Sequence, residues 1–166
     1  MAHQNKESNR KMKKDENSSC FSPRPVDNGG MNAAQMNGKY GQYQVYRLLM
    51  VHGRKCQMAR YNESFDMLID DTHRIEVKTC PSTRKDGKWL ANIHRHGVLN
   101  ENGTDAYIFR LEGVPGTTAA LHLLMTAPLK KHCLVFSVRS LLYKYPNAAL
   151  DFLHFAKTGE LPRQKA

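Results

Sequence analysis

The sequence has no long hydrophobic run, no closely spaced pair of cysteines and few acidic residues. Because it lacks an apolar stretch of about 20 residues, a membrane span is not expected. The four cysteines lie far apart without a C-x-x-C pair, which argues against a zinc ribbon or a disulfide framework. The N-terminus carries positive charge but no apolar segment follows it, which argues against secretion. An intracellular, reducing environment is therefore expected.

Acidic residues number 15, against 25 Lys and Arg residues, so the formal net charge is +10. Such an excess favours a polyanionic partner or an anionic membrane surface. The length of 166 residues suits one domain with an extension. The charge balance therefore indicates a class of partner without indicating a chemistry.

Residues 1–37 contain no Leu, Ile, Tyr or Trp and are rich in Asn, Ser, Lys and Gly. Such a segment cannot bury enough apolar surface to fold alone. We therefore expect a disordered basic tail over 1–37 and a single domain over 38–166. The tail is either a short arm that contacts a nucleic acid or a solvated extension, including one that precedes a later start at Met31 or Met36.

The hydrophobic pattern of the domain predicts both helices and strands. Apolar residues at helical spacing predict a helix over 39–52, which Gly53 ends. Three short strands are expected over 55–60, 64–70 and 74–80, the last two as an antiparallel hairpin. The later expected elements are a strand over 89–93, a buried strand over 105–111 in the sheet centre, edge strands over 121–125 and 132–136, and helices over 138–144 and 147–157. This order predicts an α/β fold with a central mixed sheet flanked by helices.

The expected hairpin places two carboxylates and one ammonium group at one site. On its second strand Ile75 and Val77 would face the core, whereas Glu76 and Lys78 would share the opposite face. Asp66 lies on the partner strand and converges on Glu76 if the register is right. Opposite charges would then gather on one face of the hairpin.

This group of side chains suits metal-dependent chemistry on phosphate esters. Carboxylates favour a hard cation such as Mg²⁺, with Mn²⁺ as a substitute, and the backbone carbonyl of Val77 would be a further ligand. Such a cation lowers the pKa of a bound water and neutralises the charge that builds on the phosphate. Lys78 would orient that water or stabilise the same charge. The implied reaction is metal-assisted phosphodiester hydrolysis.

The alternative for Glu76 and Lys78 is a salt bridge on a solvated strand face, the commonest role of Glu-x-Lys in a strand. The neighbouring apolar residues favour a functional role, because charges on a buried hairpin need a reason. These neighbours are Phe65, Leu68, Ile69, Ile75 and Val77.

Residues 39–111 resemble the PD-(D/E)xK nuclease superfamily, which has the restriction-endonuclease-like fold. The likeness is nearest to its small Holliday-junction-resolvase-like and homing-endonuclease-like members. The shared pattern is a helix ending in glycine, a hairpin carrying Asp and then Glu-x-Lys, and a later strand that opens with Asp. In this sequence the pattern falls on Gly53, Asp66, Glu76-Val77-Lys78 and Asp105.

The resemblance implies that Asp66 and Glu76 are metal ligands and that Lys78 is the catalytic lysine. Family members often carry a Glu on the first helix, but the matching position here is Gln42, with Gln44 as a less favoured substitute. A neutral amide is a weaker metal ligand, which puts a second metal ion in doubt. The implied protein is a cytoplasmic or nucleoid-associated, sequence- or structure-specific DNA endonuclease. A homodimer or higher symmetric oligomer is expected, because cutting both strands usually requires two sites.

Several residues outside the hairpin are weaker candidates. His94 and His96 would need a third metal ligand, which the sequence does not supply. Trp89 either stacks on a base or anchors the core, and Phe152 and Phe155 belong to the core or to a dimer face. Basic residues expected in loops would contact phosphates or serve solubility alone. They are Arg84, Lys85, Lys88, Arg95, Lys130 and Lys131.

Two other classes of function stay open. A non-catalytic nucleic-acid-binding module would use the same fold and basic surface; the neutral Gln42 favours it mildly, and the intact Asp66, Glu76 and Lys78 oppose it. A basic structural or RNA-associated protein would bind with strong salt dependence and no metal requirement.

Overall fold

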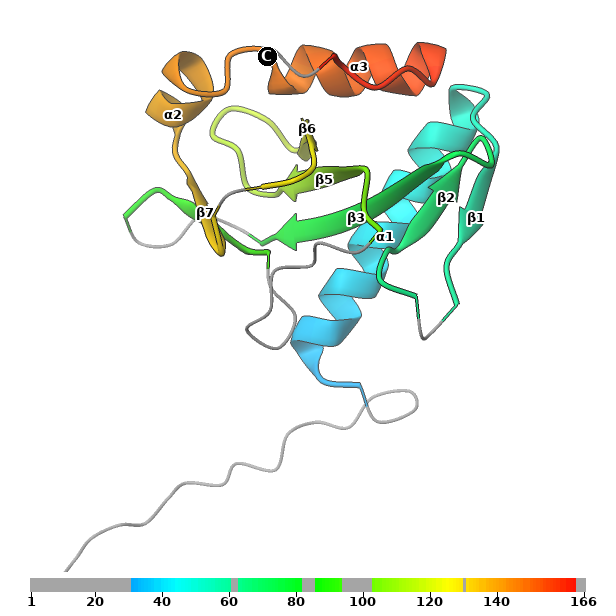
Figure 1. The fold of residues 1–166 in the computed structure, drawn as a ribbon. Helices are drawn as coiled ribbons and strands as arrows, with labels where there is room; N and C mark the ends of the chain where they lie inside the picture. The colour runs from blue at the N-terminus through cyan, green and yellow to red at the C-terminus, as the bar shows by residue number, and fades with distance from the viewer. Residues whose placement is uncertain (1–30, 61–62, 82–85, 94–102, 130, 164–166) are drawn as a thin grey trace, which may run out of the picture.

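The computed structural model describes residues 31–60, 63–81, 86–93, 103–129 and 131–163. In chain order its elements (Figure 1) are α1 (Ala33–Val51), β1 (Cys56–Met58), β2 (Met67–Ile69), β3 (His73–Cys80), β4 (Trp89–Asn92), β5 (Ala106–Leu111), β6 (Leu121–Thr126), β7 (Cys133–Phe136), α2 (Val138–Tyr143) and α3 (Ala148–Thr158). No helix within these ranges is both long enough and apolar enough to cross a membrane.

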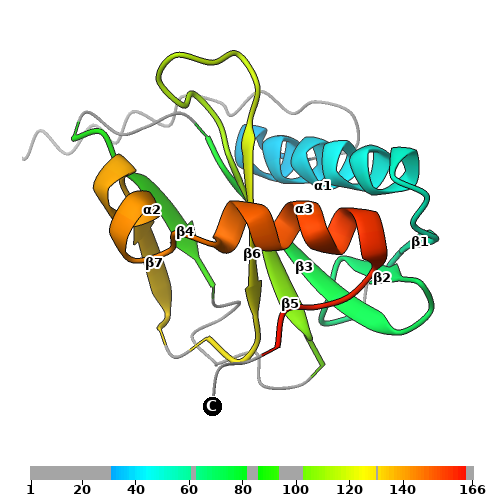
Figure 2. The ribbon, with the colours of Figure 1, turned by 90° about the horizontal axis from the view of Figure 1, so that it is seen from above.

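Five strands form the main sheet in the order β1-β2-β3-β5-β6. β3 and β5 run parallel, and the other neighbouring strands run antiparallel. One face of this sheet carries α1 against β3 and α3 against β6 (Figure 2). The other face packs against a two-stranded sheet of β4 and β7. The predicted α/β fold with a mixed central sheet flanked by helices is confirmed.

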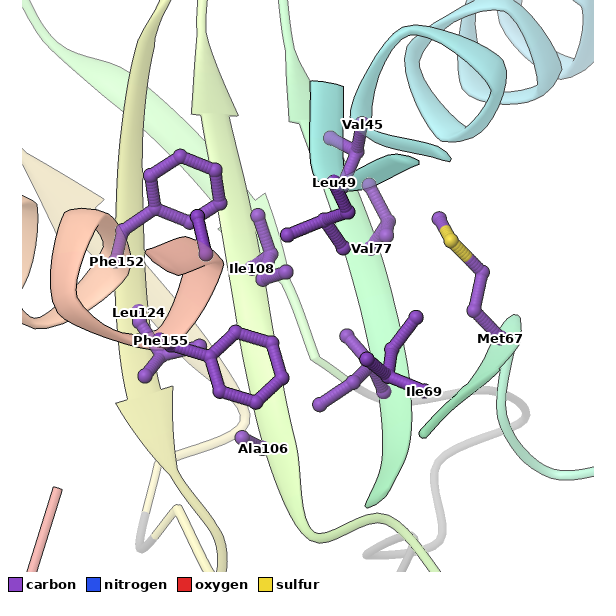
Figure 3. Packing of buried hydrophobic residues seen from close by; sticks show 12 residues of the cluster. Val45, Leu49, Met67, Ile69, Val77, Ala106, Ile108, Leu124, Phe152 and Phe155 are labelled. Atoms are coloured by element: carbon purple, nitrogen blue, oxygen red, sulfur yellow. The ribbon is translucent and has the colours of Figure 1, made fainter. Parts of the chain in front are cut away.

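An apolar cluster fills the space between the main sheet and its two helices (Figure 3). Val45 and Leu49 enter it from α1, and Phe152 and Phe155 enter it from α3; none is more than 3% exposed. Burying each large apolar side chain contributes about 1.5–3 kcal/mol. The aromatic stripe of the last helix therefore serves the core. The strands supply Met67, Ile69, Ile75, Val77, Ala106, Ile108 and Leu124.

Trp89 anchors a second apolar cluster between the main sheet and the β4–β7 sheet. Its side chain is 1% exposed, and its indole Nε1 donates to the backbone carbonyl of Glu112 at 2.7 Å. A buried, hydrogen-bonded indole is not available to stack on a base. The sequence analysis left base stacking and core packing open for Trp89, and the structure confirms core packing.

The first helix begins at Ala33, six residues before the predicted start at 39. Asn32 caps it: the side chain accepts from the Gln35 backbone N–H, and the Gln35 side chain accepts from the Asn32 N–H. This reciprocal pair satisfies two of the free N–H groups of the first turn. Residues 33–37, which the sequence placed in the tail, are therefore helical, whereas residues 1–30 lie outside the described residues.

Two predicted strand positions need correction. The strand over 132–136 was expected at an edge of the main sheet, but β7 pairs with β4 in a separate sheet, with Trp89 opposite Phe136. The strand over 105–111 was expected at the sheet centre, which β3 occupies instead; β5 lies beside it. Both corrections concern pairing between distant segments, and local hydrophobic patterns do not specify such pairing.

Gly41 lets α1 lie directly on β3. It is buried, and a Cβ at this position would overlap the side chain of Thr79. We expect Gly41→Ala to lower the free energy of unfolding by about 1–3 kcal/mol, despite the better helix propensity of Ala. Gly38 is the matched control in the same helix, because no atom lies within 4 Å of its Cβ position. Gly38→Ala should raise stability by about 0.5–1 kcal/mol in urea titrations. Equal changes in the two variants would contradict this packing.

The buried imidazole of His122 predicts a loss of stability in acid. Burial, together with the smaller effect of the nearby Arg110 charge, lowers the pKa of His122 to about 4. The ring stacks on Phe152 with centroids 5.0 Å apart. Because the folded pKa lies below the unfolded value of about 6.5, stability is complete above pH 6.5 and is lost as the pH falls toward 4.

The loss should reach up to about 3 kcal/mol, as urea titrations between pH 7.5 and pH 4 would measure. His122→Phe keeps an aromatic ring against Phe152 and removes the titrating group. Its unfolding free energy should therefore fall less steeply over this pH range. An identical pH profile in wild type and variant would assign the acid sensitivity to other groups.

Candidate active site

The turn between β2 and β3 fixes the register of the hairpin. Asp70 and Asp71 have φ values of 50° and 58°, a left-handed conformation that Asp adopts more readily than most residues. Asp70 is held by the backbone N–H of Lys55 at 2.8 Å and by the Arg54 guanidinium at 2.9 Å. The hairpin that follows pairs Met67 with Ile75, so the predicted antiparallel pairing is confirmed.

β2 and β3 separate beyond the Met67–Ile75 pair, and we call this place the strand fork. Asp66 is the first residue in the fork, and its backbone N–H donates to the Ile75 carbonyl at 2.9 Å. The paired register ends at Met67 and Ile75, and the hydrogen bond to the Ile75 carbonyl keeps Asp66 beside β3. The fork therefore places Asp66 beside the segment of β3 that carries Glu76.

The Asp66 carboxylate joins three separate segments. Its Oδ1 accepts from Gln42 Nε2 of α1 at 2.7 Å, and its Oδ2 accepts from the Val77 backbone N–H of β3 at 2.8 Å. Val77 lies beyond the last residue pair of β2 and β3, so this carboxylate takes the place of a strand carbonyl. The structure thus puts the Gln42 amide and the Val77 N–H in contact with Asp66, whereas the sequence analysis expected Val77 to act through its carbonyl.

Glu76 and Lys78 form an ion pair on the sheet face opposite the helices. The distance between Lys78 Nζ and Glu76 Oε1 is 2.5 Å, and the side chains are 22% and 12% exposed. In the parallel pairing Tyr107 lies opposite Glu76. Burial and the Glu76 charge raise the pKa of Tyr107. The pair is thus largely shielded from water, where charges interact more strongly than on an exposed surface.

The Val77 carbonyl also points into the strand fork. In a strand the N–H and C=O of one residue project to the same side. The Val77 N–H meets Asp66, and the Ile75 carbonyl on the same edge also meets Asp66. Arg74 and Cys80, by contrast, direct their carbonyls toward the β5 side. The Val77 carbonyl oxygen therefore lies on the same side as the Asp66 carboxylate.

The donor set at the fork fits a hard cation. Within the described ranges, no three residues among His, Cys, Asp and Glu are arranged to hold a metal ion. The fork supplies the Asp66 carboxylate and the Val77 carbonyl, and β3 carries the Glu76 carboxylate one residue before Val77, paired with Lys78. Mg²⁺ accepts such oxygen ligands in small number, because it keeps several waters and is completed by substrate phosphate.

Asp105 is the acidic residue that opens the later strand of the motif. Among the described contacts, its side chain meets Arg74 and not the residues of the fork. Its Oδ2 accepts from the Arg74 backbone N–H at 2.7 Å, and the Arg74 guanidinium lies 3.5 Å away. These contacts tie the start of β5 to β3. Asp105 therefore has a structural role here. The sequence feature that indicates this role is its position directly before a buried strand.

The predicted basic loop residues do not form one group in the described part of the chain. Lys88 precedes β4 and pairs with Asp86 at 3.4 Å, whereas the exposed Lys131 precedes β7. Because β4 and β7 are antiparallel, these two lysines lie at opposite ends of that sheet. The remaining candidates lie outside the described residues: Arg84, Lys85, His94, Arg95, His96 and Lys130.

Comparison with known proteins supports the fold. Neither a protein-family model nor a curated protein sequence matches this chain. Among solved structures it is similar to the bacterial homing endonuclease I-Ssp6803I, with a TM-score of 0.51 and 14% sequence identity. The match covers 64% of this chain and 77% of that chain. At this identity the likeness shows a shared fold.

Proposed function

We propose that the protein is a metal-dependent endonuclease that hydrolyses phosphodiester bonds in DNA, with a PD-(D/E)xK type of active site. The observation that carries the proposal is the strand fork, where Asp66 is held between Gln42 and Val77, the residue next to Glu76 in the β3 sequence. The shielded Lys78 ammonium beside Glu76 adds the third group that this chemistry needs. The fold shared with a bacterial homing endonuclease supports the same proposal.

Each residue of the fork has a role in the proposed reaction. Asp66, Glu76 and the Val77 carbonyl would hold Mg²⁺, or Mn²⁺ in its place. The bound cation supplies a water of lowered pKa and neutralises phosphate charge. Lys78 donates its Nζ–H to the oxygen on which negative charge builds, and Glu76 keeps that ammonium in position. Gln42 orients the Asp66 carboxylate through its amide N–H.

The neutral side chain of Gln42 favours a site with one strongly bound ion. A second divalent cation needs further negative charge, and the described fork offers only the carboxylates of Asp66 and Glu76. Gln42 also gives one of its amide protons to Asp66 rather than an oxygen to a metal. We infer one metal ion in each active site, which a titration with Mn²⁺ would count.

Cleavage assays test the proposed function directly. Supercoiled plasmid, linear duplex and a four-way junction are incubated with Mg²⁺, Mn²⁺ or EDTA, and the products are separated on gels. We expect products with either metal and none with EDTA, and the preferred DNA would distinguish sequence-specific from junction-specific cutting. Cleavage that persists in EDTA would contradict the metal requirement. Absence of cleavage on every DNA, together with no metal binding at Asp66 and Glu76, would contradict the proposal itself.

A non-catalytic nucleic-acid-binding module is the second candidate. It is favoured by one observation: both oxygens of Asp66 already accept hydrogen bonds from protein donors. In that case the carboxylate would serve only to fasten α1 to β3. DNA binding that is unaffected by Mg²⁺ and by EDTA, without cleavage, would support this candidate.

A symmetric homodimer is part of the proposal. Cutting both strands of a duplex usually uses two copies of the active site, related by a two-fold axis. Sedimentation of the free protein and of its DNA complex would give the number of chains. A monomer in both states would restrict the proposal to cutting single strands. A DNA substrate also implies an intracellular location, in the cytoplasm or at the nucleoid.

A further inference from the structure

One face of α1 carries cationic and aromatic side chains in a regular stripe. Lys39, Tyr43 and Arg47 follow one another at intervals of four residues, which places them on the same face of the helix. All three are exposed, Tyr43 by 53%. The 19 residues of α1 include no Asp or Glu. We call Lys39, Tyr43 and Arg47 the α1 stripe.

The α1 stripe borders the strand fork. Lys39 precedes Gln42 by three residues, so their side chains are neighbours on the helix surface. Tyr46 follows Gln42 by four residues and stacks on Tyr43, with ring centroids 6.2 Å apart and planes at 12°. Gln42 itself contacts Asp66. The stripe therefore lies next to the helix residue that contacts the fork.

The two cations of the stripe differ from those described basic residues that are paired with carboxylates. Six of the described Lys and Arg side chains form ion pairs with carboxylates: Arg54, Lys55, Arg74, Lys78, Lys88 and Arg110. Neither Lys39 nor Arg47 has a hydrogen bond or an ion pair with a described residue. Their charges are therefore not neutralised within the described chain and remain available to an anionic partner.

We propose that the α1 stripe binds the phosphate backbone of the DNA whose scissile phosphate enters the strand fork. This inference rests on the proposed function and adds a substrate-binding surface to it. Lys39 and Arg47 are eight residues apart, or about 12 Å along the helix axis. That span covers about three to four nucleotides of one strand. The two cations therefore contact separate phosphates, and Tyr43 packs between them against the backbone.

The salt dependence of DNA binding tests this surface. A fluorescein-labelled 30-base-pair duplex is titrated with full-length protein in EDTA, so that no cleavage occurs, at several KCl concentrations. Each phosphate contact contributes about 0.9 to the slope of log K against log salt. The double variant K39Q/R47Q should lower this slope by about 1.8 and weaken binding about ten-fold near 0.1 M KCl.

The matched control is K157Q/R163Q, which removes the same two charges from exposed positions outside α1. Its slope should stay within about 0.3 of wild type. In cleavage assays K39Q/R47Q should raise KM and leave kcat within about two-fold, because neither residue contacts Asp66 or Glu76. Tyr43→Leu should weaken binding about three-fold without changing the salt slope, because Tyr43 carries no charge.

The possible outcomes separate this inference from the proposed function. Equal slopes for the two double variants, or no binding of the duplex by wild type, would overturn the stripe. If wild type cleaves DNA but the salt slope of DNA binding does not depend on Lys39 and Arg47, the proposed nuclease activity stands and the proposed role of the α1 stripe is wrong. If K39Q/R47Q lowers the salt slope of DNA binding but wild type does not cleave any DNA, the role of the α1 stripe in binding stands and the proposed nuclease activity is wrong.

Discussion

Replacing Glu76 with Ala should reduce DNA cleavage by about 10³-fold or more while the protein remains folded. The change removes one of the two carboxylates at the strand fork and leaves Lys78 without its partner at 2.5 Å. The site then holds a cation less strongly, and the Lys78 ammonium is no longer fixed in position. Cleavage rates at saturating Mg²⁺ and the affinity for Mn²⁺ would measure the two effects.

The fold tolerates this change because Glu76 does not contribute to the core. Its neighbours Ile75 and Val77 point into the apolar cluster, while Glu76 faces the other side of the sheet. Removing one partner of this largely shielded ion pair leaves the Lys78 charge unpaired and should cost about 1–3 kcal/mol in urea titrations. Asp71→Asn is the control, because this exposed turn carboxylate is outside the fork and Asn tolerates its φ of 58°. If the Glu76 variant cleaves DNA at the wild-type rate, the active site does not include Glu76.

Asp66→Asn should abolish cleavage and also weaken the fold. Asp66 accepts hydrogen bonds at both oxygens, from Gln42 Nε2 and from the Val77 N–H. An Asn side chain has one acceptor oxygen, so one of these donors would face an amide NH₂ group. We expect cleavage to fall by about 10³-fold and the free energy of unfolding to fall by about 1–3 kcal/mol.

A double-mutant cycle separates the two effects of Asp66. Gln42→Ala removes a donor that the side chain of the Asp66→Asn variant cannot satisfy. The stability loss of the double variant should therefore be smaller than the sum of the losses of the two single variants. Circular dichroism and urea titrations on the four proteins give the coupling. Additive losses would mean that the 2.7 Å contact between Gln42 and Asp66 contributes nothing to stability.

The sequence was sufficient to predict the hairpin because both of its strands carry a local signal. Alternation of Ile75 and Val77 with charged residues indicated β3, and the Asp70-Asp71 turn indicated the antiparallel return. The hydrogen bond from the Val77 N–H to Asp66 was not predicted, because the sequence analysis expected Asp66 to converge on Glu76. The proximity of Gln42 did not follow from any pattern in this chain and came from resemblance to a nuclease family.

Other features depended on contacts between distant segments. The pairing of β4 with β7, and the place of Tyr107 beside Glu76, are set by tertiary packing that no local periodicity encodes. The early start of α1 depended on the Asn32–Gln35 capping box, which lies in a segment of low hydrophobicity. The lack of an acidic partner among the described residues distinguishes Lys39 and Arg47 from the paired cations, since the side chain of Lys55 is 61% exposed and still pairs with Asp71. Such pairing is known only from the fold.

The strand fork also determines which inactive variant is suitable for trapping the protein on intact DNA. Asp66 terminates the hydrogen-bond ladder of β3 at Val77 and fastens α1 through Gln42, so a substitution there alters the shape of the surface that receives the substrate. Among the described hydrogen bonds, the Glu76 side chain contacts only the Lys78 side chain and no backbone group, and it projects from a strand that its neighbours hold in place. A Glu76 variant is therefore the better choice for capturing an uncut complex in its native geometry.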